Sequence, residues 1–174
     1  MRITTRGRYA LRASLALARL QKQASSTEHQ SDTASEQSSG SHPVLLTNRK
    51  GREPPVSINQ LAGEEQISSV FLEQIFFKLR KAGIVNSIRG PGGGFQFARA
   101  LDKISLKEIL EAAGEELNVI DCDKNAKVCK ITGKKCLSHS VWEDINRVLD
   151  DYFKNTTLAK VLERETVPHP AKQH

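Results

Sequence analysis

The sequence predicts a mainly α-helical fold with one small β-hairpin, and three observations support this prediction. Apolar residues recur with a period near 3.6 in several segments, which is typical of amphipathic helices. Between residues 84 and 98 this period gives way to two short strand-like runs around a turn that contains four glycines and a proline. Ser followed three residues later by Gln or Glu, a pattern that marks helix starts, occurs before two of the helical segments.

The first helix is expected from about Thr5 to Lys22, where apolar residues lie at helical spacing. Residues 23–40 follow with almost no large apolar side chain, so they cannot bury enough surface to offset the entropy of ordering and are predicted to be disordered. Residues 41–55 continue this insertion and contain a short apolar patch at 44–46, for which we expect a brief edge strand.

Two helices joined by a tight turn are expected next. Ser57 and Gln60 form a capping box that opens a helix over about 58–65, and Ser68 caps a second helix from about Ser69 to Ala82, with Gly83 just beyond its end. Strands at 84–88 and 95–98 then flank a turn at 89–94. A hairpin directly after a helix-turn-helix is a wing, so the predicted fold is a winged helix-turn-helix.

A second capping box at Ser105 opens a helix that ends near Gly114, and a polar, cysteine-bearing loop follows at 118–136. A long helix is expected over 138–153 and a short one over 158–163. The predicted organisation is therefore a winged-helix domain formed by 1–22 and 56–100, a disordered insertion at 23–55, a cysteine loop with dimerisation helices at 101–165, and a flexible tail at 166–174. The apolar stripe of the 138–153 helix suggests antiparallel packing across a two-fold axis in a homodimer.

The chain is basic, with a net charge of +6 and a pI near 9.3, and its positive charge is concentrated in the first 22 residues and around 78–89. Double-stranded DNA is the partner that explains this distribution most simply, with a solvated cationic face as the alternative. The sequence contains neither a secretory signal nor an apolar run of about 20 residues, so we expect a cytoplasmic protein without a membrane partner.

The N-terminal turns of the second helix of a helix-turn-helix reach base edges in the major groove. We therefore expect DNA contacts from Ser69, Val70, Phe71, Glu73 and Gln74. The amide of Gln74 can pair with adenine, and the carboxylate of Glu73 can accept from cytosine N4 while it repels phosphates. Core packing is an equal alternative for Phe71, and an ordinary surface charge is the alternative for Glu73.

The wing is expected to lie over the minor groove, where Arg89 meets concentrated negative potential and Gly90 and Pro91 allow a close backbone approach. A phosphate-binding loop is the rival interpretation of these glycines. That motif requires a Lys followed by Ser or Thr directly after the last glycine, and Phe95 stands there instead.

All three cysteines lie in the 118–136 loop, in the pattern C-x6-C-x6-C-x2-H formed by Cys122, Cys129, Cys136 and His139. Three thiolates and an imidazole can hold either a [2Fe–2S] cluster or zinc. The long spacers favour the cluster, since structural zinc usually uses closer pairs. A buried apolar role for these cysteines is disfavoured because their neighbours are Asp, Lys and Asn.

Several motifs together resemble the iron–sulfur cluster regulator family, IscR. They are MRITTRGRYA at 1–10, FLEQIFFKLRKAG at 71–83, RGPGGGF at 89–95 and CLSHSVW at 136–142. The resemblance implies a homodimeric winged-helix repressor that carries one [2Fe–2S] cluster per subunit on Cys122, Cys129, Cys136 and His139. It implies DNA contacts from Glu73, Gln74, Ser87, Arg89, Gly90 and Pro91. It further implies control of cluster-assembly genes, with a cluster-assembly scaffold as the cluster donor and Glu73 as the residue that discriminates between two classes of site.

Three features depart from the family pattern: each cysteine spacer is one residue longer, Val70 stands where a polar residue is expected, and the insertion at 23–55 is additional. We expect the cluster to order the cysteine loop and so to change which DNA site the protein accepts. The alternatives are a nitric-oxide or redox sensor on the same scaffold and a zinc-stabilised module. An enzyme is not expected, because the sequence shows neither a cofactor fingerprint nor a convincing nucleophile with its base.

Overall fold

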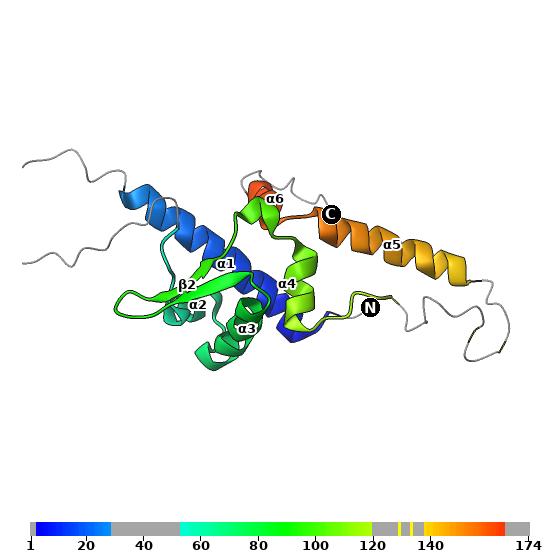
Figure 1. The fold of residues 1–174 in the computed structure, drawn as a ribbon, viewed down its shortest axis with the longest axis horizontal. Coiled ribbons are helices and arrows are strands. Elements are labelled where there is room, and N and C mark those ends of the chain that lie inside the picture. The colour runs from blue at the N-terminus through cyan, green and yellow to red at the C-terminus, as the bar shows by residue number, and fades with distance from the viewer. Residues whose placement is uncertain (1–2, 29–52, 120–128, 130–132, 134–137, 166–174) are drawn as a thin grey trace, which may run out of the picture.

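The computed structural model describes residues 3–28, 53–119, 129, 133 and 138–165 (Figure 1). The patch at 44–46 and the tail at 166–174 lie outside these residues. The elements are α1 Thr5–Glu28, α2 Ile58–Glu65, α3 Ser69–Lys81, β1 Val85–Ile88, β2 Gly94–Phe97, the 3-10 helix η1 Leu101–Lys103, α4 Leu106–Ala113, α5 His139–Asn155 and α6 Leu158–Glu165. A mainly helical fold with one β-hairpin wing is thus confirmed. Within the described part of the chain, no helix is both long and apolar enough to span a membrane.

The core forms where α1 packs against α2, α3 and α4. Three alanines on one face of α1 (Ala10, Ala13 and Ala16) are fully buried, so the other helices can approach its backbone closely. Larger side chains from the surrounding elements complete the core, among them Leu17, Leu61, Leu72, Phe76 and Ile109. Figure 1 shows α1 as the long blue helix beside α4, with α2 and α3 below it.

The first helix is longer than predicted, because it continues past Lys22 to Glu28 and enters the segment expected to be disordered. Once a helix has formed, each further residue adds a hydrogen bond at little cost, and Gln23 and Ala24 are good helix formers. Low apolar content was therefore a poor guide to where this helix ends.

The predicted caps are confirmed. Ser57 and Gln60 form a reciprocal capping box at α2, as do Ser105 and Glu108 at α4, and the Ser68 side chain accepts from the amide of Phe71 at the start of α3. Gly83 follows α3 with φ +70°, a left-handed conformation that glycine adopts without strain. These local signals fix the two helices of the helix-turn-helix.

The wing is a two-stranded antiparallel hairpin in which Val85 is paired with Phe97 and Ile88 with Gly94. The hairpin is also attached near its turn to the segment before α2, because Val56 and Phe95 exchange two backbone hydrogen bonds of 2.9 and 2.8 Å. Gly94 permits this attachment: a Cβ atom at that position would lie 2.2 Å from the Val56 carbonyl oxygen. The hairpin is thereby fixed to the helix-turn-helix.

The long helix α5 extends away from this core, whereas α6 returns to it (Figure 1). Phe153 near the end of α5 packs against the core, and Leu158 at the start of α6 is fully buried. Lys107 of α4 also forms an ion pair with Asp150 of α5, and this hydrogen bond raises the pKa of Lys107. The C-terminal end of α5 is therefore held to the winged-helix domain.

Candidate nucleic-acid interface and cysteine segment

The helix α3 has one buried and one exposed face. Leu72, Ile75, Phe76 and Leu79 are buried against the core. The opposite face exposes Val70, Glu73, Gln74 and Phe77. Three of these four residues, all but Phe77, are among those expected from the sequence to read DNA. The way in which α3 is packed thus leaves their side chains free to meet a groove.

Phe71 belongs mainly to the packing of α3 on α1. Its ring stands edge-on to that of Tyr9, with centroids 5.7 Å apart, and it is partly buried against the core. This arrangement corresponds to the core-packing alternative for Phe71. Ser69, in the first turn, is half-buried.

The tip of the wing exposes Ser87, Arg89, Gly90 and Pro91. The turn closes through a 2.9 Å hydrogen bond from the Gly93 amide to the Gly90 carbonyl, and Gly90 has φ +108°. A Cβ atom on Gly93 would lie 2.4 Å from the Ile88 carbonyl oxygen, so this turn requires glycine there. The glycines thus serve the shape of the wing.

A direct contact joins α3 to the wing. The Nη1 atom of Arg80 donates to the Ser87 hydroxyl at 3.3 Å, and the same guanidinium lies 5.5 Å from the centre of the exposed Phe77 ring. Arg80 therefore helps to hold the two candidate DNA-contacting elements in one arrangement.

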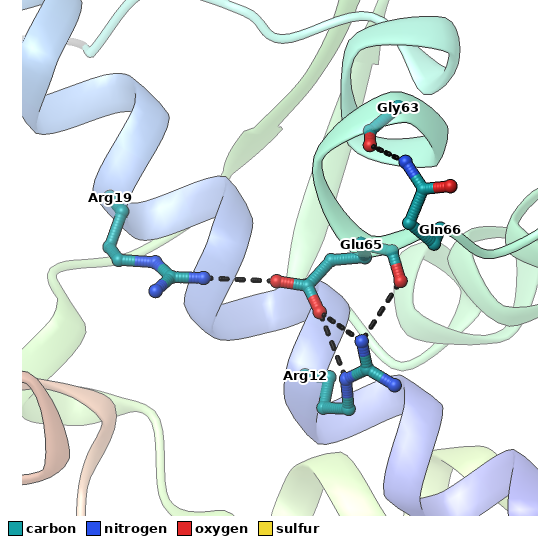
Figure 2. A network of polar contacts seen from close by, with 5 residues as sticks. All are labelled: Arg12, Arg19, Gly63, Glu65 and Gln66. Atoms are coloured by element: carbon teal, nitrogen blue, oxygen red, sulfur yellow. Dashed lines mark hydrogen bonds and ion pairs between the residues drawn. The ribbon is translucent and has the colours of Figure 1, made fainter.

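A buried carboxylate attaches the helix-turn-helix to α1 (Figure 2). Glu65, the last residue of α2, is only 8% exposed and forms ion pairs of 2.9 Å with both Arg12 and Arg19. Arg12 also donates to the Glu65 carbonyl oxygen at 2.9 Å, which satisfies an end group of α2. Gln66 then turns the chain with φ +54°, and its side-chain amide donates to the Gly63 carbonyl. Two basic residues of the N-terminal cluster thus orient the turn between α2 and α3.

The end of α4 contacts both α3 and the N-terminus. Lys78 of α3 donates to the Ala113 carbonyl at 3.2 Å. The Glu115 carboxylate accepts from the backbone amides of Thr4 at 3.0 Å and Gly7 at 3.1 Å, and from the Thr4 hydroxyl. Residues 113–115 therefore join α3 and the start of α1 just before the cysteine loop begins.

Glu115 is 7% exposed. Burial opposes ionisation of its carboxyl, but the hydrogen bonds from Thr4 and Gly7, together with the charge of Arg6, outweigh that cost and hold the pKa of Glu115 below its ordinary value. Gly7 provides the space for this contact, because a Cβ atom there would lie 2.6 Å from the Glu115 side chain. The carboxylate acts as a cap for α1 supplied from more than 100 positions further along the chain.

Of the four predicted metal ligands, the structure describes Cys129 and His139, whereas Cys122 and Cys136 lie outside the described residues. Cys129 is half-buried. His139 is the first residue of α5. In the part of the chain that the structure describes, no three Cys, His, Asp or Glu residues gather as a metal site.

A cavity of about 470 Å³ is lined by α4, by residues 115–118 and by α5 from His139 to Asp150. Asn118 and His139 both line it, as do Trp142 and Asn146. Asn118 and His139 stand at the two ends of the cysteine segment, which comprises the cysteine loop together with the residues up to His139. The side-chain oxygen of Asn146 accepts from the Val119 amide at 2.7 Å. Both ends of the segment are thus held beside one cavity.

Sequence reasoning missed Glu65, Glu115 and Phe77. The partners of the two carboxylates are 46 to 111 positions away, so no local spacing marks these contacts. Phe77 follows Phe76, and only the phase of the helix distinguishes the exposed ring from the buried one. A helical projection could have identified Phe77.

Comparison with known proteins shows the family to which the chain is similar. Residues 34–164 match the model of the Rrf2 family, described as an iron-dependent transcriptional regulator. A relative from Erwinia tasmaniensis, the HTH-type transcriptional regulator IscR, is 30% identical over 167 residues, which cover 96% of this chain and 82% of the relative. The resemblance that the sequence motifs indicated is thereby confirmed.

Two solved structures share the fold. IscR of T. potens aligns with a TM-score of 0.62 and 23% identity over 99% of this chain and 94% of that one. CymR, the global cysteine regulator of B. subtilis, aligns with a TM-score of 0.65 and 22% identity over 94% and 98% of the two chains. At this level of identity the likeness shows the fold alone.

Proposed function

The chain belongs to the Rrf2 family of transcriptional regulators, and from that premise we propose that it is a homodimeric repressor whose DNA binding is controlled by a [2Fe–2S] cluster. Like its relatives, it is a transcriptional regulator and not an enzyme. The observation that carries the proposal is the set of polar contacts at 113–119, which connects the start of the cysteine loop to α3, α1 and α5.

In this proposal α3 enters the major groove of double-stranded DNA. Gln74 pairs with adenine, and Glu73 accepts from cytosine while rejecting base pairs that offer no donor. Arg89 inserts into the adjacent minor groove, where the wing meets the backbone closely through Gly90 and Pro91. Arg80 keeps the wing and α3 in register through Ser87.

The donor set fits a [2Fe–2S] cluster. Three thiolates and one imidazole provide four protein ligands of the kinds that such clusters use, and His139 lies at the start of α5 beside the cavity. Cys122, Cys129, Cys136 and His139 would hold the group. When bound, it would supply a redox- and oxygen-sensitive centre. Its binding free energy would order the cysteine segment.

The chain's own residues would carry that change to the DNA-binding surface. Val119 is bonded to Asn146 of α5, Glu115 holds the start of α1, and Ala113 accepts from Lys78 of α3. A segment ordered at 118–136 would bias the positions of these groups and thereby the position of α3. Glu73 is the proposed residue at which this shift alters the choice between two classes of DNA site.

The dimer is proposed to form through the exposed face of α5. Val141, Ile145, Val148 and Tyr152 lie on this face at spacings of four, three and four residues, and they are 37 to 67% exposed. Two such faces can pack across a two-fold axis and bury this apolar surface, which gives a pseudo-palindromic DNA site. The proposed targets are cluster-assembly genes, with a cluster-assembly scaffold as the cluster donor.

Anaerobic purification followed by iron, sulfide and absorption analysis tests the cofactor. The proposal predicts two irons and two sulfides per chain with visible absorption, which are lost in the Cys136→Ala variant. A colourless protein with one zinc per chain would contradict it and would favour the structural-zinc alternative. Footprinting on the upstream region of the protein's own gene cluster then tests whether the same preparation protects a two-fold symmetric site.

A further inference from the structure

Val70 is an apolar residue in an exposed position that the fold does not explain. It is the second residue of α3, two positions after the Ser68 cap, and it is 65% exposed. A β-branched side chain there lowers helix propensity slightly, and it gains little burial in return. Among the described residues, the large apolar side chains that are exposed all belong to α3, β1 or α5.

The position of Val70 places it with the candidate base-reading residues. Glu73 and Gln74 lie three and four residues later, so all three side chains share one face of α3. The first turns of the second helix are the part of a helix-turn-helix that approaches base edges. Val70 lies one turn of α3 before Gln74 on this face. It therefore meets a base close to the one that Gln74 meets.

The chemistry of the major groove restricts what Val70 can recognise. Valine offers neither a donor nor an acceptor, and a polar base edge covered by its methyl groups would be left without a partner. The C5-methyl group of thymine is the apolar feature that base edges present there. We infer that Val70 is a specificity-determining residue that selects thymine at one position of each half-site by contact with this methyl group, an inference that rests on the proposed reading of DNA by α3.

The test removes the methyl group alone. A duplex is selected from a random-sequence library with the protein in its cofactor-loaded form, and each thymine is replaced, symmetrically in both half-sites, by deoxyuridine. Base pairing is unchanged by this replacement. At one thymine position we expect the affinity to fall by about fourfold for each half-site, or about 15-fold for the symmetric duplex, since burying one methyl-sized group contributes a factor of this order.

Protein variants then identify the contacting side chain. Val70→Ser should bind thymine and deoxyuridine duplexes within twofold of each other at that position, whereas Val70→Ile should retain the preference. Ala100→Ser introduces the same side chain at an exposed position beside η1, outside α3, the wing and α5, and should leave the thymine preference intact. The inference would be overturned if the unaltered protein bound every deoxyuridine duplex as tightly as the thymine duplex. An undiminished thymine preference in Val70→Ser would also overturn it. Both results would leave DNA binding by α3 in place. Failure to select any duplex would instead overturn the proposed function.

Discussion

Two buried carboxylates, Glu65 and Glu115, each connect segments that are far apart in the sequence. Glu65 receives Arg12 and Arg19 at the end of α2, and Glu115 receives the first residues of α1 at the end of α4. A carboxylate withdrawn from water must be paired, and losing its charge leaves the surrounding donors with weaker partners. Each of these residues therefore gives a prediction that concerns a single side chain.

Replacement of Glu65 by Gln should lower the free energy of unfolding by about 1–2 kcal/mol, because both ion pairs are lost while the two arginines remain partly open to water. Urea denaturation measures this change. Asp144→Asn is the matched control, since Asp144 and Arg147 form a pair in which both side chains are 66% exposed. The control should change the stability by less than about 0.5 kcal/mol. Equal effects of the two substitutions would contradict the assigned role of Glu65.

Replacement of Glu115 by Gln should reduce the acid sensitivity of folding. The pKa of this carboxyl is lowered in the folded protein, so its contribution to stability is fully present above the unfolded value of about 4.5 and is lost as the pH falls through the folded value. Urea denaturation between pH 6 and pH 3.5 should therefore show a shallower decline for Glu115→Gln than for the unaltered protein. The adjacent, exposed Glu116 provides the control as Glu116→Gln. Parallel curves for the Glu115 variant and the unaltered protein would refute the assignment.

At the scale of single elements, the sequence predicted what local patterns encode. The capping boxes at Ser57 and Ser105, the stripe of α3 and the glycine turn of the wing are all signals within a few residues, and the elements form where they were expected. The predicted end of α1 was wrong by six residues, because the composition that suggested disorder also permits a helix to continue. Contacts such as Lys78 to Ala113 depend on how elements pack, which no local period encodes.

The candidate site follows the same division. The exposure of Val70, Glu73 and Gln74 follows from the phase of the stripe on α3, which the sequence displays directly. The dual position of Phe71, on the reading helix but packed against Tyr9, required the position of α1. The cysteine pattern predicts a ligand set, and two of its four members lie among the described residues.

At the scale of the whole molecule, α5 presents an apolar face that lies outside the winged-helix core. Val148→Asp should weaken self-association on the order of 100-fold or more, because a two-fold interface would bury two unpaired carboxylates. Sedimentation equilibrium measures the change. Lys154→Asp places the same side chain on α5 outside the apolar face and should leave the dimer intact. A monomeric unaltered protein at micromolar concentration would contradict the proposed dimer.

The most direct test of the account is the affinity of the cluster-loaded and cluster-free proteins for the same pair of DNA sites. The two forms are prepared anaerobically and titrated against duplexes from two classes of selected site at fixed salt, since phosphate contacts make affinity salt-dependent. We predict that the two forms differ by at least tenfold on one class of site, and that Glu73→Ala reduces this difference to within about threefold. Identical affinities of the two forms for every site would contradict control of DNA binding by the cluster.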